Sequence, residues 1–156
     1  MQIRLAFEND IPALSRLLYQ TIDVHAHARP DLFKVGTKKY TDEKLKEIVS
    51  DSNTPVFVAE EEGEMLGYAF CVFQKFQSDP VLTNVKTMRI DDICVDERYR
   101  RRKIGTQLYR FVLSFAKTLG CYNVTLNVWA CNQSALRFYE SCGLRVQKIG
   151  LETVLN

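Results

Sequence analysis

The sequence lacks the patterns that mark membrane, secreted and zinc-binding proteins. No apolar run approaches the length of a membrane span, and the first residues lack the apolar run of a signal peptide. The five cysteines contain no C-x-x-C pair, and the two histidines have no zinc-site spacing. We therefore expect a cytoplasmic protein with no membrane partner and no metal ion, in which most cysteines are buried thiols.

Familiar phosphate-binding motifs are also missing. Neither the P-loop G-x-x-x-x-G-K-[ST] nor the dinucleotide fingerprint G-x-G-x-x-G occurs. The chain has no repeat, low-complexity segment or linker, so its 156 residues, 46% of them hydrophobic, are expected to form one domain over residues 1–156. The net charge of +2 is too small to indicate a nucleic-acid partner, but it is unevenly divided, −2 over residues 1–90 and +4 over residues 91–156.

What the sequence does contain is a strand that leads through a basic turn into a helix. Ile93-Cys94-Val95 is an apolar run typical of a buried strand, and seven of the eight residues 96–103 are charged. Apolar residues at spacings of three and four begin at Ile104 and mark one face of a helix. The unpaired N–H groups of that helix start, the cations Arg100 to Lys103 and the close approach that Gly105 permits predict an anion site.

The remaining pattern predicts the element order β-α-α-β-β-β-α-β-α-β. We expect an α/β (α+β) fold, with a mixed, mainly antiparallel central sheet and helices on both faces, because three strands follow one another before a strand–helix–strand unit. Strands are expected at residues 2–7, 55–60, 65–76, 86–95 and 122–129, with one or two more within 143–155. Helices are expected from Asn9 or Asp10, from Thr41, from Ile104 to before Gly120 and over 132–141. The end of the first helix is open, since Pro30 interrupts any helix through residues 25–33, and residues 77–85 are expected to form a loop.

Two motifs resemble signatures of the GNAT N-acetyltransferase superfamily. Arg100-x-x-Lys103-x-Gly105 is similar to its pyrophosphate loop, R/Q-x-x-G-x-G/A, except that a lysine stands where the family usually has its first glycine. The second motif is similar to the segment after the family's fifth strand and reads Asn132-x-x-Ala135-x-x-Phe138-Tyr139-x-x-x-Gly143. The element order is also similar to the family's, so the resemblance covers almost the whole chain and implies a single GNAT-like domain.

The resemblance implies acetyl-coenzyme A as a co-substrate. The loop and helix would hold its pyrophosphate, and the fourth strand would bond its pantetheine arm and offer the N–H of Cys94 or Ile93 to the thioester oxygen. Asn132 would contact the arm or the reaction intermediate, and Tyr139 would protonate the leaving thiolate. The implied cofactor-binding residues are Ile93, Cys94, Val95, Arg100, Arg101, Arg102, Lys103, Ile104, Gly105, Thr106, Asn132, Ala135 and Phe138.

A general base is needed because an amine must be neutral to attack a thioester. Asp91 and Asp92 are the catalytic candidates, since they lie just before the coenzyme-binding strand residues, where several members of the family carry an acidic residue. Successive strand residues face opposite sides, so only one is expected to aim at the acceptor, and parity with the apolar residues that follow favours Asp91. His25 and His27, in the segment that corresponds to the family's acceptor wall, are the second option.

The predicted activity is direct acetyl transfer to a primary amine of a small molecule or peptide, without a covalent step at Cys94 or Cys142. A catalytically silent coenzyme A-binding regulatory domain and a nucleic-acid-binding module using Arg98 to Lys103 are the alternatives. The acidic N-terminal half favours a cationic acceptor, whose identity the sequence does not define. The short segment after Gly143 leaves the acceptor cleft open or completed by a partner chain, as in a homodimer.

Overall fold

The computed structural model describes residues 1–75 and 79–155 and contains one five-stranded sheet in the order β1-β2-β3-β4-β5. The strands are β1 (Gln2–Leu5), β2 (Val56–Glu61), β3 (Glu64–Lys75), β4 (Lys86–Val95) and β5 (Asn123–Leu126). The first four pair antiparallel, and β5 pairs parallel with β4. The predicted antiparallel meander with one parallel neighbour is therefore confirmed.

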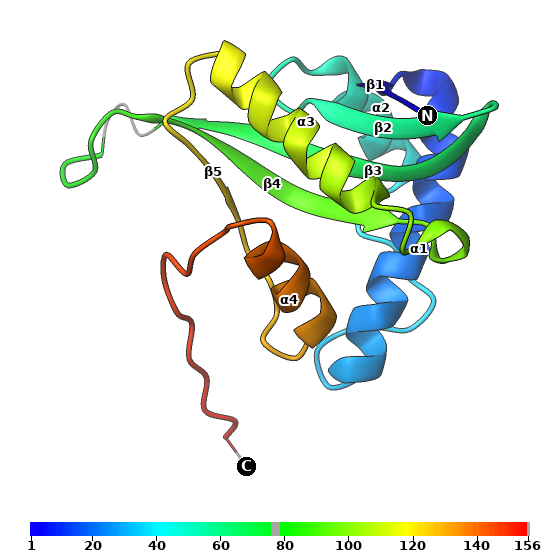
Figure 1. Ribbon diagram of the computed structural model, residues 1–156. Coiled ribbons are helices and arrows are strands. Elements are labelled where there is room, and N and C mark those ends of the chain that lie inside the picture. Colours follow the sequence, from blue (N-terminus) through cyan, green and yellow to red (C-terminus); the bar gives the residue numbers. More distant parts are fainter. Residues whose placement is uncertain (76–78, 156) are drawn as a thin grey trace.

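Helices cover both faces of the sheet, as predicted (Figure 1). α1 (Ile11–Ala28) and α2 (Asp42–Ser50) pack on one face, whereas α3 (Ile104–Thr118) packs on the other and α4 (Gln133–Ser141) follows β5. Short 3-10 helices at Glu8–Asp10 and Glu97–Tyr99 precede α1 and α3. None of the helices in the described part of the chain is long and apolar enough to cross a membrane.

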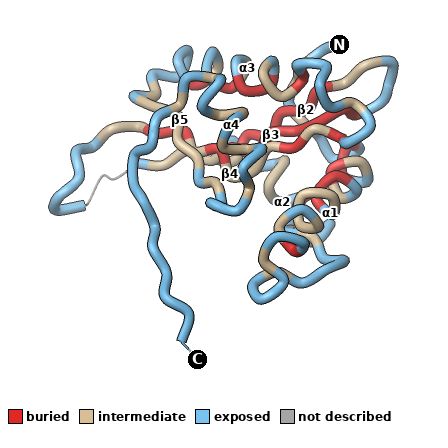
Figure 2. The backbone as a smooth tube through the Cα atoms, turned by 60° about the horizontal axis from the view of Figure 1, so that its bottom comes forward, coloured by how far each residue is buried: buried red, intermediate tan, exposed pale blue. Residues whose placement is uncertain are grey.

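Two apolar layers hold the helices to the sheet. Leu108 and Val112 of α3 are fully buried in one cluster, together with Met88 of β4. Leu14 of α1 and Leu45 of α2 are fully buried in the other. Figure 2 shows the buried residues concentrated in the sheet and on the inner sides of these helices. Full burial of such a side chain contributes about 1.5–3 kcal/mol, so the amphipathic spacing read from the sequence is what fixes both layers.

Element boundaries follow local chemistry closely. α1 ends at Ala28, two residues before the helix-breaking Pro30, which places an end that the sequence had left open. Thr41 caps α2 by accepting a hydrogen bond from the Lys44 N–H at 3.2 Å. Gly120 lies in the left-handed region at φ +70°, just beyond α3. The predicted end of the third strand at Phe76 and start of the loop at Gln77 lie outside the described residues.

The C-terminal prediction is wrong in two respects. The strand expected over residues 122–129 is only Asn123–Leu126, and residues 143–155 contain no strand. Instead, the chain leaves α4 and runs as an extended, exposed segment away from the sheet (Figure 1). The alternation of apolar residues is present, but a strand needs a partner for its backbone groups, and this segment has none among the described residues.

Candidate functional site

A β-bulge in β4 places the two adjacent aspartates. The β3–β4 register pairs Phe70 with Asp92 and Cys71 with Ile90, which leaves Asp91 as an extra residue. Asp91 contacts Tyr40, and Asp92 contacts Tyr68, both of which belong to the core layer under α1 and α2. The expectation that only one aspartate could face this side is therefore wrong, because the bulge breaks the alternation on which it depended.

The two carboxylates differ in their partners. Asp91 accepts hydrogen bonds from Lys39 at 2.6 Å, from Arg89 at 2.9 Å and from Tyr40. Burial alone would raise the pKa of Asp91, but the bonds from Lys39 and Tyr40 hold it below its usual value. Asp92 is hydrogen-bonded by Tyr68 at 2.7 Å, and burial raises its pKa to about 6. Asp92 is thus the carboxylate whose proton affinity suits transfer near neutral pH.

Beyond Ile90, β4 and β5 no longer pair. Their parallel register covers only Thr87 to Ile90 of β4, and β5 then turns away (Figure 1). In the described part of the chain, the β5-facing edge of residues 91–95 has no strand beside it. The fourth strand therefore ends with an open backbone edge that an extended ligand can bond.

Pairing with β3 decides which backbone groups lie on that open edge. The Asp96 N–H donates to the Leu66 carbonyl at 2.9 Å, and successive residues of an antiparallel pair alternate in direction. The Cys94 backbone groups therefore point toward β3, and a Cβ on Gly67 would lie 2.6 Å from the Cys94 carbonyl oxygen. The backbone groups of Ile93 point the other way. Of the two N–H groups considered from the sequence, that of Ile93 faces the open edge.

The second motif forms α4 beside this edge. Asn132 caps the helix by accepting a hydrogen bond from the Ala135 N–H at 3.1 Å. Tyr139 is half-buried, and its pKa is raised by burial and then by the Asp92 carboxylate. Phe138 lies against Gly105, where an added Cβ would be 3.2 Å from the ring. The glycine of the first motif therefore makes room for an aromatic ring of the second.

The basic turn has an unusual backbone. Arg101 and Lys103 both adopt positive φ, +67° and +60°, and Lys103 is the N-cap of α3 in the left-handed region. The Gln107 N–H donates to the Lys103 carbonyl and so begins the hydrogen bonding of α3. The N–H groups of Ile104, Gly105 and Thr106 precede it in the first turn, where helix N–H groups have no intrahelical partner. Amides grouped this way, with positive φ beside a helix start, form an anion-binding concavity.

Ion pairs divide the cations of this turn into two groups. Arg98 pairs with the fully buried Asp96, and Arg102 pairs with Glu61 at 2.6 Å. Burial alone would raise the pKa of Asp96, but Arg98 and Arg16 hold it well below its usual value. Arg100, Arg101 and Lys103 form no salt bridge within residues 1–75 and 79–155. The first group fixes the turn, and the second is left to meet an anion.

Lys103 gives a prediction on strain, because a left-handed φ costs an L-residue roughly 1 kcal/mol relative to glycine. We expect Lys103→Gly to be about 1 kcal/mol more stable than Lys103→Ala in urea unfolding. Both variants lose the same charge, so their difference isolates the backbone term. Equal stabilities would contradict the left-handed conformation at this position.

Several residues near the aspartates were missed by the sequence reasoning. Tyr68 of β3 is fully buried and bridges Asp92 to Thr21 of α1, whose hydroxyl lies 3.0 Å from the phenol oxygen. Lys39 and Tyr40 reach Asp91 from the loop before α2. An apolar strand pattern does not distinguish a tyrosine that packs from one that also hydrogen-bonds, and the partners from the loop come together only through the fold.

An aromatic row borders the site on the side of α1. His25 stacks on Phe33 with ring centroids 5.2 Å apart, and Phe33 meets the edge of Trp129 at the same separation. His25 lies one turn beyond Thr21, and its pKa is lowered by burial and then by Lys39, so it is neutral at pH 7. His27 is exposed, with Nδ1 2.6 Å from the Asp23 carbonyl oxygen. Of the two histidines, His25 is the half-buried one, and the Lys39 that influences its pKa also bonds Asp91.

Cys94 is a poor nucleophile in this setting. Its thiol is buried in the layer under α1, and burial raises its pKa to about 11. A thiol with this pKa is almost entirely protonated at pH 7, whereas the reactive form is the thiolate. The Cys94 thiol is therefore unsuited to act as a nucleophile at neutral pH.

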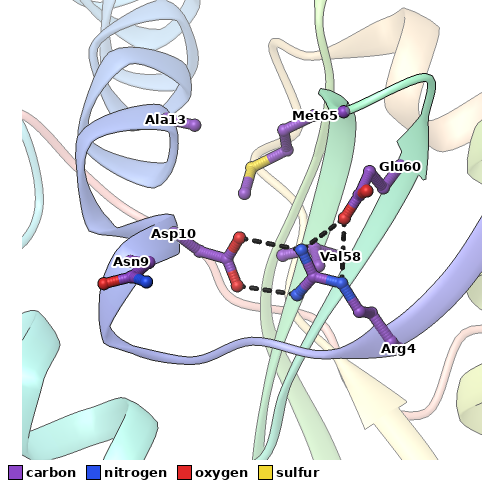
Figure 3. A pocket seen from close by; sticks show the side chains of 8 residues that line it. Arg4, Asn9, Asp10, Ala13, Val58, Glu60 and Met65 are labelled. Carbon is purple, nitrogen blue, oxygen red and sulfur yellow. Dashed lines mark hydrogen bonds and ion pairs between the residues drawn. The ribbon is translucent and has the colours of Figure 1, made fainter.

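A separate pocket lies near the N-terminal end of α1, away from these residues. Figure 3 shows Arg4 between the carboxylates of Asp10 and Glu60, with Val58 and Met65 on the apolar side. Arg4 donates two hydrogen bonds to Asp10, at 2.8 and 3.0 Å, and is also bonded to Glu60. Because the charged groups that line this pocket are paired with one another, we assign them a structural role as an ion-pair network.

Comparison with known proteins matches the whole arrangement to one family. The sequence model of the Acetyltransferase (GNAT) family matches residues 21–144. An uncharacterized N-acetyltransferase of Archaeoglobus fulgidus is 28% identical over 153 residues, which are 96% of this chain and 97% of that protein. The glucosamine 6-phosphate N-acetyltransferase of Arabidopsis thaliana is 34% identical over 64 residues, which cover 41% of each protein. The chain thus matches less than half of the length of this plant relative.

A solved structure agrees more completely. A tetramutant of the BH1408 protein from Bacillus halodurans superposes with a TM-score of 0.94 and 29% identity. The match covers 99% of this chain and all of that one, so it includes the extended C-terminal segment.

Proposed function

Because the chain belongs to the acetyltransferase (GNAT) family, we propose that it transfers an acetyl group from acetyl-coenzyme A directly to a primary amine of a small molecule. The observation that carries the proposal is the open edge of β4 after Ile90, which runs from the aspartates to the amide-lined start of α3. Acetyl-coenzyme A carries its thioester at one end of a long arm and its diphosphate at the other. The open edge of β4 has a carboxylate of raised pKa at one end and an anion site at the other, so it would suit such a molecule. We also propose that the protein is cytoplasmic, forms a homodimer and does not bind nucleic acid.

The start of α3 would bind the diphosphate. The amides of Ile104, Gly105 and Thr106 and the unpaired cations Arg100 and Arg101 offer donors and positive charge together. The outward backbone groups of Ile93 and Val95 would bond the pantetheine arm, much as an added strand does. The site of the diphosphate and the pantetheine arm would be bordered by Arg102, Lys103, Cys94, Asn132, Ala135 and Phe138.

The reacting groups would lie at the middle of β4. The Ile93 N–H would donate to the thioester oxygen as negative charge develops on it. The Tyr139 phenol is protonated at neutral pH, as tyrosine ordinarily is, and burial raises its pKa further, so it has a proton to give to the departing thiolate. The donor therefore leaves as a neutral thiol.

Asp92 would act as the general base, directly or through water. A free alkylamine has a pKa of about 10.4, so holding it neutral at pH 7 costs roughly 4–5 kcal/mol. Asp92, with a pKa of about 6, is ionised at pH 7 and can accept a proton from the amine as it attacks. Asp91 remains the second candidate, although Lys39 and Arg89 already neutralise its charge.

The acceptor would enter along the aromatic row. Phe33 and Trp129 contact each other edge to face and would offer it an apolar wall, and carboxylate and aromatic groups together favour a cationic amine. The similarity to glucosamine 6-phosphate N-acetyltransferase makes amino sugars the first acceptors to test.

Calorimetric titration with acetyl-coenzyme A tests the donor site. We expect saturable binding that weakens about 10-fold or more in Arg100→Ala/Arg101→Ala, because charge-assisted hydrogen bonds to phosphate are lost. Arg110→Ala, an exposed arginine further along α3, should bind like the unchanged protein. No binding at millimolar ligand would refute the proposal, and binding without turnover over a broad amine screen would favour a silent regulatory domain.

A further inference from the structure

Asp92 depends on a single side chain for its hydrogen bonding. Among residues 1–75 and 79–155, the Tyr68 phenol is the one side chain that bonds it, at 2.7 Å, and Asp92 takes part in no salt bridge there. The neighbouring Asp91, by contrast, is bonded by three side chains. A carboxyl group removed from water favours its protonated form unless hydrogen bonds stabilise the charge. The Tyr68 phenol is therefore placed to decide the ionisation of Asp92.

The core holds the Tyr68 side chain in place. Tyr68 is fully buried and lies opposite Cys94 in the β3–β4 pairing, so Asp92, two residues earlier on β4, is its diagonal neighbour. Its ring meets the ring of Phe70 edge to face, with centroids 4.9 Å apart. Because packing already fixes the phenol, its hydrogen bond to Asp92 needs no ordering of the side chain during a reaction.

Thr21 of α1 adds a second step to this contact. Its hydroxyl lies 3.0 Å from the phenol oxygen of Tyr68. The phenol has one hydrogen and an ionised carboxylate can only accept, so that hydrogen goes to Asp92. Thr21 is then the donor in its contact with Tyr68, and the chain runs from Thr21 through Tyr68 to Asp92. Hydrogen bonds that point in one direction along a chain strengthen one another.

We propose that Tyr68 and Thr21 are positioning residues for the base, which hold the Asp92 carboxylate in one orientation and stabilise its ionised form. The inference rests on the proposed function, in which Asp92 accepts the proton of the amine. Burial raises the pKa of Asp92 to about 6, and the bond from Tyr68 keeps it from rising further. Packing alone would require no hydroxyl at either position, because phenylalanine and valine have almost the same shapes as tyrosine and threonine.

Other groups around Asp92 also act on it, and their influence has to be separated from that of Tyr68. Besides burial and the bond from Tyr68, Lys39 lowers the pKa of Asp92 and Asp91 raises it. α1 contributes the uncharged hydroxyl of Thr21. The titratable and charged groups that face Asp92 are Tyr68 on β3, Asp91 and Cys94 on β4, Lys39 and Tyr40 before α2, and Tyr139 on α4.

Tyr68→Phe tests the inference through the titration of the Asp92 carboxyl group. Carbon-13 NMR of the aspartate carboxyls follows this group without turnover, and the Asp92 signal is identified by its loss in Asp92→Asn. We expect the midpoint to rise from about pH 6 by about one pH unit or more, because a hydrogen bond to a charged group is lost. The Thr21 hydroxyl can turn to the Leu17 carbonyl, 3.4 Å away, so the variant leaves no buried donor unpaired. Thr21→Val should shift the midpoint in the same direction by a smaller amount.

Acetyl transfer by Tyr68→Phe should depend on pH in the same way. A midpoint raised by one to two pH units lowers the ionised fraction of Asp92, so kcat/KM should fall about 2- to 10-fold at pH 7 and recover near pH 9. Tyr40→Phe is the matched control, because its phenol lies in the same layer but bonds Asp91. This control should leave the Asp92 midpoint in place.

The two readouts separate this inference from the proposed function. An Asp92 midpoint that stays near pH 6 in Tyr68→Phe would overturn the inference, whatever the protein catalyses. A midpoint that moves further in Tyr40→Phe would overturn it too, and so would a loss of kcat/KM that persists at pH 9. If the midpoint moves as expected but the unchanged protein acetylates no amine, the proposed function fails, while the control of Asp92 by Tyr68 is supported.

Discussion

Replacing Tyr139 by phenylalanine is expected to lower kcat about 100-fold or more, the usual contribution of a positioned acid. Only the hydroxyl is lost, and it makes no hydrogen bond to the described residues, so packing and stability should change little. Acetyl-coenzyme A should bind as before, because the phenol is needed when the carbon–sulfur bond breaks and not when the donor binds. Steady-state kinetics with a free-thiol readout, alongside calorimetry, measures both.

Tyr109→Phe is the matched control for this result. Tyr109 is a buried tyrosine on α3 whose pKa is also raised by burial, and it lies near enough to Tyr139 to influence its pKa. A loss common to both variants would indicate a packing effect. If Tyr139→Phe turns over at the normal rate, the thiolate takes its proton from water or from another group, and Tyr139 is a packed aromatic of α4.

The sequence was sufficient for the sheet order and both helical layers because these depend on local periodicity. The helix from Ile104 and the strand over residues 86–95 have the predicted starts, since charged turns and Gly120 bound them sharply. The unpaired amides at the start of α3 were also predictable, because a helix start has such amides in any fold. Lys103 has positive φ, a conformation that glycine adopts without strain. This is a physical reason for the glycine that is usual at this position in the family.

The aspartate geometry was not accessible in this way. A bulge adds one residue to one strand and leaves no mark in the apolar pattern, so counting parity from Ile93 back to Asp91 gave the wrong face. Tyr68 and Lys39, which separate the pKa values of the two carboxylates, come from elements far away in sequence. The expectation of one or two strands within residues 143–155 failed for a related reason. Alternation predicts that this segment can form a strand, but it does not provide the partner strand that its backbone groups need.

Asp92→Asn is the second change expected to have a large effect, with a fall of roughly 10²- to 10⁴-fold in kcat/KM. The amide still accepts the hydrogen bond from Tyr68 but cannot take a proton from the amine. With Asp92 present, kcat/KM should rise with pH and level off near pH 6, where the carboxylate becomes ionised. The variant should lack this limb. Asp91→Asn is the comparison, and a larger loss there would make Asp91 the base.

The stability of Asp92→Asn should rise although its activity falls. This result would exclude the explanation that the variant is inactive because its fold is damaged. The pKa of Asp92 is raised to about 6 on folding, so ionised Asp92 destabilises the fold above that pH, while below about pH 4 it is protonated in both states and the penalty is gone. Two pKa units correspond to about 3 kcal/mol at most. Asp92→Asn should therefore melt at a higher temperature than the unchanged protein at pH 8, and the difference should vanish near pH 4. A variant that is both inactive and less stable at pH 8 would show that Asp92 holds the fold together and does not serve as the base.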